Sequence, residues 1–109
     1  MESWKLNQIA VEPQKPQVLD SESEGRAIVI KLLAGERLQE HQVHERAWLV
    51  VTDGEVEVSD ASGDSVSGGV GLLATFDPNE RREVTARSDA RLLLVLSPWP
   101  GDGHPSQVT

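Results

Sequence analysis

The chain has 109 residues, which is the size of one domain. It carries 18 Asp and Glu against 10 Lys and Arg, a formal net charge of −8, and it contains no cysteine. The negative charge argues against nucleic acid and anionic membranes as partners, because both are bound through basic surfaces. The lack of cysteine excludes disulfides, a thiolate zinc site and a cysteine nucleophile.

The predicted elements, taken in chain order, are short and extended. Residues 1–25 are polar, contain Pro13 and Pro16, and are expected to form an N-terminal arm with edge strands. Runs of β-branched, apolar or alternating residues follow at 26–34, 47–52, 55–59, 70–76, 82–86 and 90–97, each of ordinary strand length. No window has a sustained helical period, so the pattern predicts an all-β sandwich or barrel.

Two further features concern the connections and the ends. Asp53-Gly54 separates two strand-like runs and is a strong signal for a hairpin. Residues 98–109, with three prolines and two glycines, are expected to be an irregular tail whose order depends on a pocket for Trp99.

The N-terminus has no secretory signal, and the longest apolar run, residues 92–96, is too short for a membrane span. We therefore expect a cytoplasmic protein with no membrane partner.

Residues 35–54 (GERLQEHQVHERAWLVVTDG) and 71–86 (GLLATFDPNERREVTA) resemble the two motifs of the cupin family. Gly35, His41, Gly54 and Gly71 match position for position, and the order of strands and motifs agrees across about residues 26–97. The resemblance implies a double-stranded β-helix, the RmlC-like jelly-roll barrel, usually assembled as a homodimer. It predicts one cupin domain over 1–109, with an arm at 1–25, a barrel at 26–97 and a tail at 98–109.

The resemblance also implies where a metal would be held. Metal-binding cupins use two His and a Glu from the first motif and a His from the second. Here the first position is His41, and the other three hold Val43, Ala47 and Arg82. Valine and alanine have no donor atoms and arginine stays protonated, so this degenerate motif predicts no metal cofactor. The alternative is a one-residue insertion in the loop, which makes His41, His44 and Glu45 non-standard ligands of a divalent transition metal.

Arg82 is the candidate for an anion-binding group. It shares a strand face with Val84 and Ala86, and the family register puts that face inside the barrel. One interpretation is a fork that binds a carboxylate or phosphate. The other is an internal ion pair, since a buried guanidinium is costly without a partner. The candidate acids for that pair are Glu40, Glu45 and Asp77.

The residues therefore support two functions of different classes. The first is a small-molecule binding barrel without a metal, in which an apolar pocket holds a small anionic ligand. Its predicted lining is His41, Arg82, Val43, Ala47, Leu49 and Val84. The second is a metal-dependent cupin enzyme of the oxygenase, isomerase or decarboxylase type. We favour binding over catalysis.

Trp48 and Val50 are predicted to point outward from their strand and to form a homodimer interface.

Overall fold

The computed structural model describes residues 1–41 and 43–105, and for residues 39–41 it describes the backbone alone. The described chain forms nine strands: β1 (Gln17–Glu22), β2 (Gly25–Leu32), β3 (Arg37–His41), β4 (Arg46–Asp53), β5 (Val56–Asp60), β6 (Ser65–Gly68), β7 (Leu73–Phe76), β8 (Arg82–Ala86) and β9 (Ala90–Ser97). Within these residues there is no helix long and apolar enough to cross a membrane.

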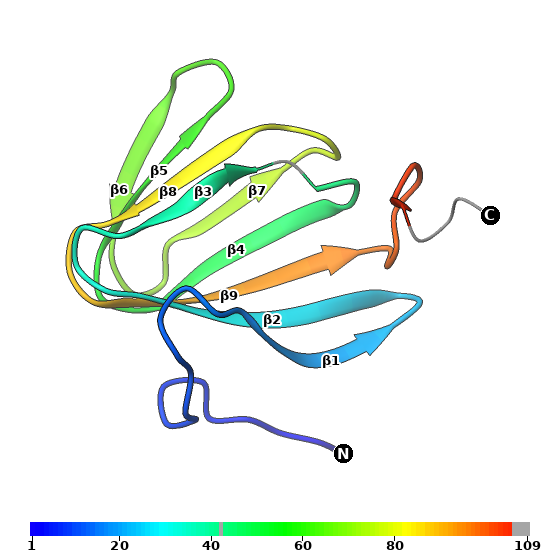
Figure 1. The fold of residues 1–109 in the computed structure, drawn as a ribbon, viewed down its shortest axis with the longest axis horizontal. Coiled ribbons are helices and arrows are strands. Elements are labelled where there is room, and N and C mark those ends of the chain that lie inside the picture. Colours follow the sequence, from blue (N-terminus) through cyan, green and yellow to red (C-terminus); the bar gives the residue numbers. More distant parts are fainter. Residues whose placement is uncertain (42, 106–109) are drawn as a thin grey trace.

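The strands form two antiparallel sheets that enclose one core (Figure 1). The five-stranded sheet has the order β1-β2-β9-β4-β7, and the four-stranded sheet has the order β3-β8-β5-β6. Most neighbours within a sheet are distant in sequence, because consecutive segments of the barrel pass from one sheet to the other. The prediction of an all-β jelly-roll architecture is confirmed.

The core is built by strict alternation along the longer strands. In β9, Ala90, Leu92, Leu94 and Leu96 are buried and the residues between them are half-buried. The same alternation runs through β4 and β8, where every second side chain points inward. Burial of each large apolar side chain contributes about 1.5–3 kcal/mol, so this pattern is the main source of stability.

The hairpin predicted at Asp53-Gly54 is wrong. Strand β4 pairs with β9 and β7, whereas β5 pairs with β8 and β6, so the two strands flanking Gly54 lie in different sheets. Gly54 has a φ of 76°, and a Cβ there would overlap the carbonyl oxygen of Asp89 and lie 2.8 Å from the Cα of Ala90. The glycine therefore marks a crossover between sheets, where two backbone segments approach closely, and the same residue type would suit either structure.

Strands β3 and β6 were not predicted from the sequence, because they are short and rich in polar residues. Strand β7 begins at Leu73, later than the predicted run. The preceding turn is held by backbone hydrogen bonds from Val51 N to Leu72 O and from Gly71 N to Val51 O.

The N-terminal arm lies against its own chain, since Arg91 donates hydrogen bonds of 2.7 Å to the carbonyl oxygens of Leu6 and Ile9.

The outer face of the five-stranded sheet carries the predicted dimer interface. Trp48 and Val50 are half-buried, and Leu73, which pairs with Val50, is 56% exposed. We predict that this face joins two copies, so sedimentation at micromolar concentration should give a dimer. Val50→Lys should shift it to monomer, whereas Val66→Lys on the opposite sheet should not. A wild-type species of 11.9 kDa would contradict the prediction.

Candidate functional site

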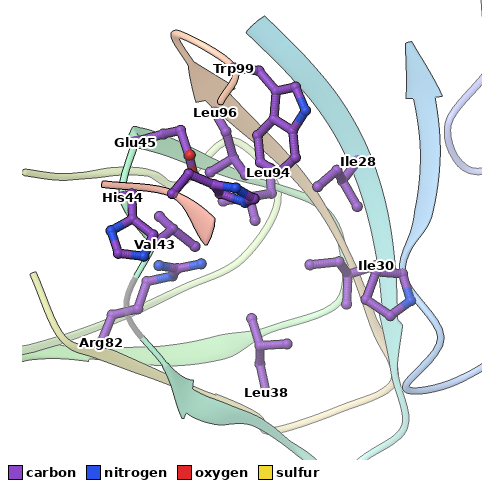
Figure 2. A pocket seen from close by; sticks show the side chains of 12 residues that line it. Ile28, Ile30, Leu38, Val43, His44, Glu45, Arg82, Leu94, Leu96 and Trp99 are labelled. Carbon is purple, nitrogen blue, oxygen red and sulfur yellow. The ribbon is translucent and has the colours of Figure 1, made fainter. Parts of the chain in front are cut away.

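A cavity of about 290 Å³ opens at one end of the barrel, between the two sheets (Figure 2). Its walls come from β2, β3, β8 and β9, from the loop before β4, and from the segment that follows β9. The lining residues are Pro16, Ile28, Ile30, Leu38, Val43, His44, Glu45, Arg82, Leu94, Leu96, Trp99 and His104. Most of this surface is aliphatic, with a few polar groups, as in many small-molecule sites.

Arg82 is the arginine of the cavity lining and is only 3% exposed. It is the first residue of β8, where its backbone is paired with His41 of β3 and Asp60 of β5. Its guanidinium carbon lies 5.5 Å from the centre of the Phe76 ring. None of its three side-chain nitrogens has a hydrogen-bond partner among the described residues. Burial lowers the pKa of Arg82, because the charged form is removed from water.

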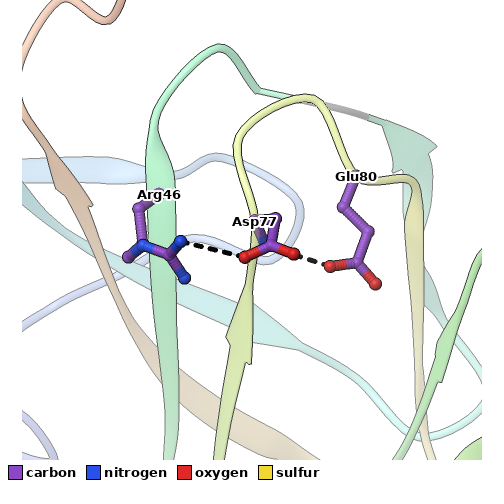
Figure 3. A network of polar contacts seen from close by, with 3 residues as sticks. All are labelled: Arg46, Asp77 and Glu80. Carbon is purple, nitrogen blue, oxygen red and sulfur yellow. Dashed lines mark hydrogen bonds and ion pairs between the residues drawn. The ribbon is translucent and has the colours of Figure 1, made fainter.

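Two of the three acids considered as partners of Arg82 are engaged elsewhere. Glu45 is buried, and its Oε2 accepts a 2.7 Å hydrogen bond from the backbone N–H of Gly101. Asp77 forms a 2.9 Å ion pair with Arg46, and its backbone N–H donates to Glu80 (Figure 3). The side chain of Glu40 lies outside the described residues. The described part of the structure therefore gives no support to an internal ion pair of Arg82.

The segment after β9 lies beside Glu45 and contributes Trp99 and His104 to the cavity wall. Trp99 stacks edge-on with His104 at 4.9 Å between ring centres, and Arg26 places its guanidinium carbon 3.8 Å from the Trp99 ring centre. A Cβ at Gly101 would overlap the carbonyl oxygen of His44, so only glycine allows this approach. Within the described part of the tail, Trp99 lines the cavity and packs against the hydrophobic core.

Comparison with known proteins identifies the architecture. No family model matches the sequence, and no curated protein is significantly similar to it. An RmlC-like cupin protein from Desulfovibrio desulfuricans has 19% identity and a TM-score of 0.80, covering 90% of this chain and 97% of its own. This chain has the cupin fold.

Other solved structures with the cupin fold are also similar to this chain. A conserved protein with a double-stranded β-helix domain from Klebsiella pneumoniae has 15% identity and a TM-score of 0.77, over 90% of each chain. The Cnp3 cupin domain of Schizosaccharomyces pombe also has 15% identity and a TM-score of 0.77, over 88% of this chain and 73% of that one. At these identities the likeness concerns the fold, which hosts many functions.

Within this cupin fold, the predicted site residues separate into two groups. Val43 and Arg82 line the cavity, whereas Ala47, Leu49 and Val84 belong to the hydrophobic core beside it. The reason is volume: in the middle of this small barrel the facing side chains fill the interior, and open space remains at one end. The side chain of His41 lies outside the described residues.

The structure adds residues that the sequence reasoning assigned differently or missed. His44 is half-buried and Glu45 fully buried, and both line the cavity, although neither was included in the favoured lining. Trp99 and His104 reach it from the tail. The only local signal for them is an aromatic residue within a Pro/Gly-rich terminus, which does not reveal where the tail docks.

The residues of this cavity do not fit the metal centre that the cupin resemblance implies. Among the described residues there is no cluster of three His, Asp or Glu side chains arranged to hold a metal ion. Glu45 already accepts the Gly101 N–H, and the Arg82 cation faces the same cavity and repels a metal cation. The described lining holds two imidazoles, His44 and His104, and these with Glu45 are not placed as the three or more donors that transition metals need.

Proposed function

We propose that this cupin-fold protein binds a small organic anion in the cavity, and that Arg82 holds its carboxylate. The supporting observation is the buried guanidinium, whose three nitrogens lack partners among the described residues. A buried polar group left without a hydrogen bond costs about 1–3 kcal/mol, and more when it is charged. A carboxylate accepts two parallel N–H bonds from this fork, which satisfies the donors and neutralises the charge.

A second polar group predicted for the proposed site is His41, whose side chain lies outside the described residues. Its backbone is directly opposite Arg82 in the β3–β8 register, which brings the two positions to the same end of the barrel. Imidazole donates a hydrogen bond at neutral pH without a metal, so it suits a second contact to the anion. Val43 and the aliphatic wall exclude water around the ion pair and so strengthen it.

The test is a thermal-shift screen of small carboxylates against wild type and Arg82→Met. Carboxylates should stabilise the wild type and leave Arg82→Met unchanged, and the corresponding amides should bind about ten- to a hundredfold more weakly, the equivalent of about 1.5–3 kcal/mol. Arg87→Met is the matched control, because Arg87 is exposed and pairs with Glu57 at 2.6 Å. Equal stabilisation of wild type and Arg82→Met would overturn the proposal.

A metal analysis tests the alternative function. We expect purified protein to hold no stoichiometric transition metal, because Val43 and Ala47 have no donor atoms and Arg82 stays protonated. Elemental analysis after purification without chelators provides the measurement. Near-equimolar metal that disappears in His41→Ala would instead support the metal-dependent cupin enzyme, with His41, His44 and Glu45 as ligands.

A further inference from the structure

The chemistry of the cavity wall narrows the class of anion. Apart from Arg82, the surface is dominated by aliphatic side chains on β2, β3 and β9, namely Ile28, Ile30, Leu38, Leu94 and Leu96. Arg82 lies across the cavity from Ile28 and Ile30 (Figure 2). A ligand whose carboxylate meets Arg82 therefore directs the rest of its body toward apolar surface.

We infer that the ligand is a monocarboxylate with an extended apolar body, such as a medium-chain fatty acid or an aryl-alkyl acid, rather than a dicarboxylate or a small hydroxy acid. This inference rests on the proposed function, because it assumes that Arg82 anchors the carboxylate. It adds the chemical nature of the remainder of the molecule and the residues that select it.

The size of the cavity sets the length of that body. An apolar cavity of about 150 Å³ is large enough to bind benzene. The present cavity, at about 290 Å³, is roughly twice as large. It therefore suits a carboxylate carrying a chain of about six carbons or a ring with a short linker, whereas acetate leaves most of the apolar wall without a contact.

The charges of the lining select against a second carboxylate. Arg82 is the only Lys or Arg among the described residues that line the cavity, and the buried carboxylate there belongs to Glu45. The other titratable side chains of the described lining are His44 and His104. A second ligand carboxylate placed against the aliphatic wall or beside the Glu45 carboxylate loses solvation without gaining an ion pair.

The experiment is a titration series by calorimetry at pH 8, where free imidazole is neutral. The series keeps the carboxylate constant and lengthens the alkyl chain from acetate through butanoate and hexanoate to octanoate. Affinity should rise by about fourfold per buried methylene until the cavity is full. Adipate and hexanamide are matched to hexanoate in carbon number, and each should bind at least about tenfold more weakly than hexanoate.

Four variants assign the effects to the cavity. Ile28→Phe reduces the free volume and should weaken hexanoate and octanoate while leaving butanoate nearly unchanged. Val66→Phe, on the exposed edge strand β6 of the other sheet and outside the cavity lining, should leave the whole series unchanged. Arg82→Met should abolish binding of every acid, and Arg82→Lys, which retains the charge without the planar fork, should retain a part of it.

The possible results distinguish a failure of the inferred apolar body from a failure of the proposed carboxylate site. If acetate or adipate binds as well as hexanoate, and Arg82→Met abolishes that binding, the site binds anions but the inferred apolar body is wrong. If no acid binds, or if Arg82→Met binds like wild type, the proposed function itself fails. If Arg82→Met does not fold, Arg82→Lys and the chain-length series on wild type decide both points.

Discussion

Arg82→Met is expected to raise the free energy of unfolding of the ligand-free protein by about 1–4 kcal/mol while it removes carboxylate binding. Methionine fills much of the same volume and needs no hydrogen bonds, whereas the guanidinium is 3% exposed and has no partner among the described residues. Urea unfolding followed by far-UV circular dichroism measures the change. Such a gain, together with lost binding, is typical of a residue kept for function at the expense of stability.

The control for this measurement is Arg87→Met, which removes an exposed ion pair with Glu57 and should change stability by less than about 1 kcal/mol. A loss of several kcal/mol in Arg82→Met would show that the guanidinium has a stabilising partner inside the barrel. In that case Arg82 is a structural residue and the anion site is wrong.

The pH dependence of this gain has a defined sign. Burial lowers the pKa of Arg82, so the folded protein holds this proton less tightly than the unfolded chain does. The resulting penalty is present wherever the group is charged, and it is relieved only as the pH rises through the lowered pKa of the folded state. Because arginine stays protonated near neutrality, the gain in Arg82→Met should be constant between about pH 5 and 9.

The second large effect is expected at the crossover between the sheets. Gly54→Ala should destabilise the fold by about 2–5 kcal/mol, the sum of a left-handed backbone penalty and a steric overlap. Its φ is 76°, and the added methyl group would overlap the carbonyl oxygen of Asp89. Because the atoms nearest to the added methyl group are backbone atoms of Asp89 and Ala90, a side-chain rotation cannot relieve the overlap. Thermal and urea unfolding of the variant measure the loss.

Gly35→Ala is the matched control for this variant. Gly35 has a φ of 85°, but a Cβ there meets no atom within 4 Å, so the substitution carries the backbone penalty alone, about 1–2 kcal/mol. The difference between the two variants isolates the close approach of the two backbone segments. Equal losses would mean that the crossover relaxes and that the contact with Asp89 is not a constraint on the fold.

Much of the fold could be predicted because the informative patterns are local. The alternation in β4 and β8 determines which side chains point inward, and that rule depends only on the period of an extended chain. It groups Arg82 with Val84 and Ala86 on one face, and Trp48 with Val50, before any pairing is known, and the motif resemblance assigns the Arg82 face to the interior. The motif resemblance then supplied the barrel topology, which alternation alone does not specify.

The details of the candidate site were predictable only in part. Arg82 and Val43 line the cavity as the motif register suggested, but Ala47 and Leu49 do not, because packing of the middle of the barrel leaves space at one end only. The contribution of Trp99 depends on a docking of the tail that no local pattern reveals. A residue can thus be correctly placed on the inner face and still lie in the core instead of the site.

The sequence by itself determined which side chains share a strand face and that cysteine chemistry is absent, because these follow from the period of two along a strand and from residue type. The inward side of the Arg82 face and the expected metal positions came from the motif resemblance. Only the tertiary structure decided that Gly54 joins two sheets, that Glu45 accepts the Gly101 N–H, and that Arg82 faces an apolar cavity. The physical reason is that the pairing of strands and the volume left unfilled in the barrel both depend on contacts between segments distant in sequence. Every core side chain contributes to that packing.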